Sequence, residues 1–141
     1  MRALVTLVVA VVGSWIVSYF AQLALGIAFN ANEELIVAMV LHIAFVLGVG
    51  IVFGIVLLAG GGVRALRIAA LSIIVFAFLA LAGLEAFALT DESLLLAPGD
   101  LPLLIEMGVP ALLAVLIQWW ALRRYLNRSA PPRASAAIAA G

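Results

Sequence analysis

The sequence contains no cysteine and no lysine, and these two absences exclude several kinds of chemistry. Without cysteine there is no disulfide, no thiolate metal site, no covalently attached haem and no cysteine nucleophile. Without lysine there is no Schiff base with retinal or pyridoxal phosphate and no phosphate-loop lysine. The seven basic residues are therefore all arginines.

Charge and histidine are also scarce. Only 10% of the 141 residues are charged while 68% are hydrophobic, which is outside the range of a water-soluble domain. One histidine cannot hold a haem from both sides within one chain, and His42, Glu85 and Glu106 lack the spacing of a zinc site. No serine has the context of a nucleophile elbow, and the few arginines do not suggest nucleic-acid binding. We therefore predict no catalytic residue, metal, cofactor or nucleic-acid partner, and we favour a non-enzymatic role.

Four long apolar runs predict an all-α, polytopic membrane protein with a four-transmembrane-helix bundle. The run from Leu35 to Leu58 is uncharged, and about 24 residues at about 1.5 Å each cross a hydrocarbon core of roughly 30 Å. The first run is too long for a signal peptide and lacks a clear cleavage site. Predicted helices cover residues 4–29, 35–59, 65–89 and 101–122 in a single domain, 1–126, followed by a flexible tail, 127–141.

Turn and cap residues separate these helices. Asn32 is a suitable N-cap for the second helix, and the three glycines at 60–62 suit a helix end and a tight reversal. Asp100 is a plausible N-cap for the fourth helix, with Pro102 in its first turn, where the missing N–H costs little.

The charged residues predict the orientation in the membrane. In a four-helix topology all seven arginines fall on one side of the membrane, and the acidic residues of the loops fall on the other. The arginines are Arg2, Arg64, Arg67, Arg123, Arg124, Arg128 and Arg133. The positive-inside rule then places both termini in the cytoplasm of what we expect to be a multi-pass protein of a bacterial inner membrane. Trp119 and Trp120, next to Arg123 and Arg124, are expected to anchor the inner interface.

Small residues in the second helix predict close packing. Gly48, Gly50 and Gly54 include small-xxx-small spacing, which lets two helix backbones approach where lipid gives no hydrophobic drive for association. We expect these glycines to face another helix.

Each predicted helix carries one strongly polar side chain near its outer end, which suggests a polar layer inside the membrane. These residues are Gln22, His42, Glu85 and Glu106. In the first and fourth helices they continue inward-facing stripes at intervals of four: Ala10, Ser14, Ser18, Gln22, Gly26 and Glu106, Pro110, Ala114, Gln118. Pro110 also leaves the carbonyl of Glu106 without its helical donor.

This layer has three interpretations. Its members could reach toward headgroup water, they could form a hydrogen-bonded layer that fixes helix register, or they could form a site for a proton, a cation or a substrate.

Three functions fit these features. The leading hypothesis is a non-catalytic accessory or assembly subunit of a larger inner-membrane complex, since the chain is small and has short loops. The alternative is a homo-oligomeric channel or proton-coupled transporter that uses the His/Glu layer. The third is a membrane enzyme or a binder of lipid or quinone, which a lipid-facing pocket between two helices would favour. Expected partners are membrane lipid and either other membrane subunits or further copies of the chain.

Overall fold

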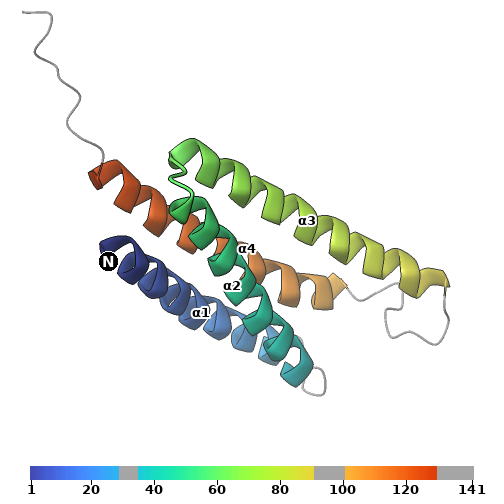
Figure 1. The fold of residues 1–141 in the computed structure, drawn as a ribbon. Helices are drawn as coiled ribbons and strands as arrows, with labels where there is room; N and C mark the ends of the chain where they lie inside the picture. Colours follow the sequence, from blue (N-terminus) through green and yellow to red (C-terminus); the bar gives the residue numbers. More distant parts are fainter. Residues whose placement is uncertain (29–34, 91–100, 130–141) are drawn as a thin grey trace, which may run out of the picture.

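The computed structural model describes residues 1–28, 35–90 and 101–129, and every element in these ranges is an α-helix. In chain order they are α1 (Arg2–Ala28), α2 (Leu35–Leu58), α3 (Val63–Thr90) and α4 (Leu101–Ser129). Successive helices run in opposite directions (Figure 1). The predicted all-helical class with four apolar helices is confirmed.

All four helices are long and apolar enough to cross a membrane, by length and composition. Their outer surfaces carry large apolar side chains, such as Phe20, Ile51 and Phe76, which are 62%, 64% and 74% exposed. Such a surface is unfavourable in water and suits a hydrocarbon environment. The fold therefore suits a multi-pass membrane protein.

The helices do not pack equally. α1 packs against α4 and α2, whereas α3 packs against α4 and α2 and makes no contact with α1 in the part of the chain described. A buried apolar cluster joins α2, α3 and α4: Val49, Phe53, Leu66, Ala70, Val115 and Leu122. The α3 members, Leu66 and Ala70, both lie in its first third. The cluster therefore holds α3 mainly by its amino-terminal part.

The predicted helix ends are close to those observed, except at the end of α4. The prediction ended this helix at 122 and began the tail at 127, but α4 continues to Ser129. This boundary was wrong because polar side chains at an interface do not stop a helix. Arg128 in the last turn complements the negative end of the helix dipole, and Ser129 Oγ donates to the Tyr125 carbonyl at 3.0 Å. The predicted caps Asn32 and Asp100 lie outside the described residues.

The predicted glycine turn between α2 and α3 is confirmed and forms a Schellman motif. Gly61 N–H donates to the Val56 carbonyl at 2.8 Å, and Gly60 N–H donates to the Leu57 carbonyl at 3.0 Å. Gly60 has a φ of 73°, in the left-handed region that glycine adopts without steric cost. Leu66 N–H donates to the Gly62 carbonyl at 3.1 Å, so the next helix begins directly after the turn.

The glycines of α2 have different surroundings. A Cβ on Gly50 would lie 2.6 Å from Val11 Cγ2, and one on Gly54 would lie 3.0 Å from Leu7 Cδ2. A Cβ on Gly48 would have nothing within 4 Å. Gly50 and Gly54 therefore let α1 approach α2 closely, whereas Gly48 is not at such a contact.

The start of α1, the turn between α2 and α3 and the end of α4 lie at the same end of the bundle (Figure 1). Six arginines belong to this arginine-rich end: Arg2, Arg64, Arg67, Arg123, Arg124 and Arg128. Arg133 lies outside the described residues. The segregation of arginine to one end agrees with the sequence pattern, and the cytoplasmic location of that end stays a prediction.

Gly60→Ala should destabilise the bundle. Alanine in the left-handed conformation costs about 1–2 kcal/mol, so the free energy of unfolding in mixed detergent–SDS micelles should fall by about that amount. Gly62→Ala is the matched control, because a Cβ there meets nothing within 4 Å and its φ is not positive. Equal losses in the two variants would contradict the assigned turn.

Candidate functional site

Six polar or charged side chains are buried between α1, α2 and α4, and we call them the polar column. They are at most 5% exposed: Ser14, Ser18 and Gln22 of α1, His42 of α2, and Glu106 and Gln118 of α4. From Ser14 to Gln22 the column extends about 12 Å along α1, at about 1.5 Å per residue. The buried polar groups thus extend along the helices, and they include three members of the predicted layer, Gln22, His42 and Glu106.

The spacing of α1 explains why this face turns inward. Its buried residues are Ala10, Ser14, Ser18, Gln22 and Gly26, which are the members of the predicted stripe. Residues four apart lie on one helix face, and the small side chains in this stripe allow α4 and α2 to come close. On α4 the predicted stripe from Glu106 to Gln118 is buried too. The inward orientation of both stripes is confirmed.

Gln118 links all three helices in the middle of the column. Its Nε2 donates to Ser14 Oγ of α1 at 3.0 Å and to the Val46 carbonyl of α2 at 3.1 Å. Ser14 Oγ in turn donates to the Val11 carbonyl at 2.9 Å. Both amide protons of Gln118 are therefore used, and each of its two bonds joins α4 to a different helix.

Ser18 and His42 form the next step of the column. Ser18 Oγ lies 2.7 Å from His42 Nε2 and 2.6 Å from the Ser14 carbonyl. A hydroxyl has one proton, so when it donates to this carbonyl, His42 Nε2 must be protonated and donate to Ser18. When His42 Nε2 is unprotonated, Ser18 Oγ donates to it instead. In both arrangements this contact joins α1 to α2.

Gln22 and Glu106 lie farther from the arginine-rich end. Gln22 is 1% exposed, and its Oε1 accepts no hydrogen bond from the described part of the chain. Glu106 is also 1% exposed. Pro110 is buried one turn later, and α4 is one helix through it. Glu85 belongs to α3, but its side chain is outside those described, so its predicted place beside the other three stays a prediction.

A lateral pocket of about 290 Å³ begins at the polar column. Gln22 and His42 supply its polar floor, and its walls are apolar side chains that include Phe45, Ala77 and Ala111. Three other lining residues, Leu41, Phe76 and Ala80, are exposed on the outer surface. The lateral pocket therefore connects the buried polar groups to the side of the bundle.

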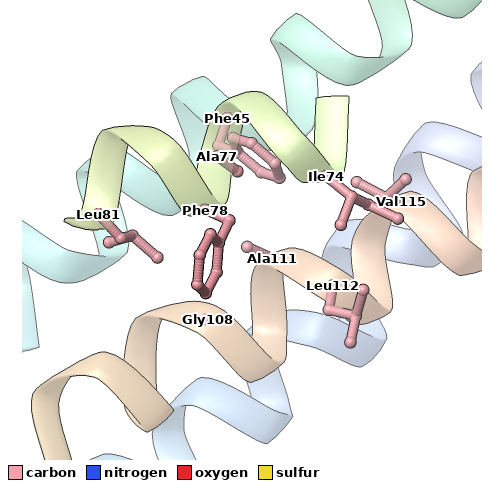
Figure 2. Close-up of a pocket in the computed structure, with 9 residues that line it drawn as sticks. All are labelled: Phe45, Ile74, Ala77, Phe78, Leu81, Gly108, Ala111, Leu112 and Val115. Atoms are coloured by element: carbon pink, nitrogen blue, oxygen red, sulfur yellow. The ribbon is translucent and has the colours of Figure 1, made fainter. Parts of the chain in front are cut away.

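A second cavity of about 170 Å³, the apolar slot, adjoins the lateral pocket. Side chains of α3 and α4 face each other across it, with Phe78 extending toward Gly108 (Figure 2). The two cavities share Phe45, Ala77, Leu81 and Ala111. They form because α3 is held at its other end and because each helix presents a small residue to the other here, Ala77 on α3 and Gly108 on α4.

The predicted interface anchors lie at the arginine-rich end, away from the lateral pocket. The guanidinium carbon of Arg123 is 5.1 Å from the ring centre of Trp119, and that of Arg124 is 5.1 Å from the ring centre of Trp120. Both are cation–π contacts, which hold the arginine side chains along α4.

Sequence reasoning placed Ser14, Ser18 and Gln118 on inward faces but did not identify them as one network. The available signal was that each of them belongs to a stripe of small or polar residues spaced four apart on its helix. The two cavities had no signal in the sequence, since they depend on how far α3 lies from α4. Among the described side chains, no three His, Asp or Glu residues gather as metal ligands.

Removing the bond between Ser14 and Gln118 should reveal a specific coupling. In a double-mutant cycle with Ser14→Ala and Gln118→Leu, we expect a coupling energy of about 1 kcal/mol in the free energy of unfolding in micelles. A parallel cycle that pairs Gln118→Leu with Ser72→Ala, on the exposed face of α3, should give a value near zero. Similar coupling in both cycles would contradict the contact.

The chain was also compared with known proteins. No family model, curated protein or solved structure matches it. Function is therefore argued from the polar column and the lateral pocket alone.

Proposed function

We propose that this chain is a membrane-embedded binding protein for a lipid with a small, uncharged, hydroxyl-bearing head group, such as a quinol or a diacylglycerol. The observation that supports this most is the lateral pocket, which joins apolar walls to a floor of Gln22 and His42. Apolar walls with a few placed polar groups are typical of small-molecule sites.

The hydrogen-bonding groups of the polar floor indicate which kind of head group fits the lateral pocket. Gln22 Oε1 is buried without a partner among the described residues and can accept a hydrogen bond from a hydroxyl. A buried acceptor left without a donor costs about 1–3 kcal/mol, so a ligand hydroxyl that satisfies it gains that amount. His42 adds a second polar contact beside it. The described floor carries no arginine, so an uncharged head suits it better than a phosphate.

The size of the two cavities suits a head and the first part of a tail. Small-molecule pockets hold about 300–1,000 Å³, and the lateral pocket, at about 290 Å³, is at the lower limit. The adjoining apolar slot adds about 170 Å³ lined by carbon-rich side chains. A ring or glycerol head would occupy the first space, and the start of an isoprenoid or acyl chain would occupy the second.

The exposed rim supports entry from the bilayer. Leu41, Phe76 and Ala80 line the pocket and also lie on the outer surface of the bundle. In a membrane this rim would face lipid tails, so an amphiphile could enter sideways. With the arginine-rich end in the cytoplasm of a bacterial inner membrane, as the positive-inside rule predicts, the polar floor would lie in the outer half of the bilayer.

The other two functions stay predictions. An accessory subunit would use the exposed helix faces for contact with partner helices, and a channel or transporter would need the polar column to be hydrated. We favour lipid binding because the lateral pocket is a specific feature that the other two functions do not require.

Gln22→Leu should weaken binding of such a lipid. The variant replaces the amide acceptor with an apolar side chain of similar size, so the dissociation constant for decylubiquinol should rise about tenfold, equivalent to about 1.4 kcal/mol. Native mass spectrometry of the detergent-solubilised protein, titrated with decylubiquinol and in parallel with dioctanoylglycerol, would measure the change and show which head group is preferred.

Gln118→Leu is the matched control, since Gln118 belongs to the polar column but does not line the lateral pocket. The affinity of the Gln118→Leu variant for the same lipids should differ less than twofold from that of the original chain. Gly108→Leu tests the apolar slot, because a Cβ at Gly108 meets nothing within 4 Å and a larger side chain would fill the space. Unchanged binding in both Gln22→Leu and Gly108→Leu would contradict the proposal.

A further inference from the structure

Two joined hollows lie on the surface between the start of α1 and the end of α4, at the opposite end of the bundle from Gln22. The first, of about 400 Å³, is lined by residues that include Trp120, Arg124 and Arg128. The second, of about 530 Å³, is lined by residues that include Arg2 and Val5. Thr6 and Tyr125 belong to both, so the two hollows meet.

The hollows have a concentrated positive charge. Arg2, Arg124 and Arg128 each contribute a guanidinium group, and Glu106 is the one carboxylate among the described side chains. Glu106 is about 27 Å from Arg124 along α4, at about 1.5 Å per residue, which is beyond a Debye length at physiological salt. The three guanidinium groups therefore share a surface without a described acid to neutralise them.

One of the arginines is also held in place. The guanidinium carbon of Arg124 lies 5.1 Å from the ring centre of Trp120. Stacking on an aromatic ring uses the face of the guanidinium and leaves its N–H groups available at the edge. The side chain therefore loses less rotational freedom when it binds a ligand.

The surrounding residues point to a phosphate attached to a lipid. Guanidinium groups form paired, charge-assisted hydrogen bonds to phosphate oxygens, and Arg124 and Arg128 line the first hollow together with Thr6 and Tyr125. Trp120 is 55% exposed at the level of the arginines, in the position that aromatic belts have at a membrane interface. Basic pockets between transmembrane helices bind anionic lipid head groups.

We propose that the hollows between α1 and α4 form a binding site for the head group of an anionic phospholipid, with Arg124 and Arg128 in one hollow and Arg2 in the other. A head group with two phosphates can contact both hollows at once, so cardiolipin should bind more tightly than phosphatidylglycerol. This site is independent of the lateral pocket, which lies farther along the helices and for which we propose an uncharged head group.

The test is native mass spectrometry of the full chain with cardiolipin, phosphatidylglycerol and phosphatidylcholine. We expect cardiolipin to bind at least tenfold more tightly than phosphatidylcholine. The double variant Arg124→Gln and Arg128→Gln should lower cardiolipin affinity at least tenfold. The matched control, Arg64→Gln with Arg67→Gln, removes the same charge at the same end of the bundle from residues that do not line the hollows, and it should change affinity less than twofold.

Three results would overturn the proposal. Equal losses in the two double variants would mean that net charge alone attracts the lipid. No preference for cardiolipin over phosphatidylcholine would exclude an anionic head-group site. Displacement of cardiolipin by an equal concentration of inorganic phosphate would identify a site for the free anion. Circular dichroism of each variant, unchanged from the original chain, would show that losses arise from binding and not from unfolding.

Discussion

Hydrogen bonds between buried side chains join three of the four helices, and in a membrane they would matter most, because lipid tails are as apolar as the helices and give little drive for association. Gln118 donates to Ser14 of α1 and to the Val46 carbonyl of α2, and Ser18 and His42 form a second link between α1 and α2. Breaking these contacts would leave polar groups buried without partners, so separation of the three helices is unfavourable. Small residues such as Gly50 allow the close approach that these bonds require.

α3 is held differently from the other three helices, and the lateral pocket lies beside it. α3 has no described polar contact with the column and is packed mainly through Leu66 and Ala70 near the arginine-rich end. Farther along, its Ala77 and Leu81 face small residues of α4, and space remains between the helices. Gln22 and His42, two members of the polar column, line the lateral pocket that adjoins this space. Tight packing and an accessible polar floor are two results of one arrangement.

Much of the fold was predictable, because long uncharged runs, a glycine turn and stripes at intervals of four have direct physical meaning. Gln22 and His42 were identified from their polarity in apolar surroundings. The network through Gln118 was not, since its bonds depend on helix rotation and on which helices are neighbours. The cavities were unpredictable for a similar reason: Ala77 and Gly108 leave space only because α3 lies where it does. The end of α4 was placed too early, since the helix continues past Arg123 and Arg124 to Ser129.

The central claim is that His42 is buried within the bundle and hydrogen-bonded to Ser18. His42 is the only histidine, so labelling with [15N]histidine gives signals from one ring. Solid-state NMR of the protein in bilayers should show ring protons protected from exchange with deuterated water and an Nε2 resonance that shifts in Ser18→Ala but not in the exposed control Ser72→Ala. Rapid exchange together with an Nε2 resonance unaffected by Ser18→Ala would contradict the account.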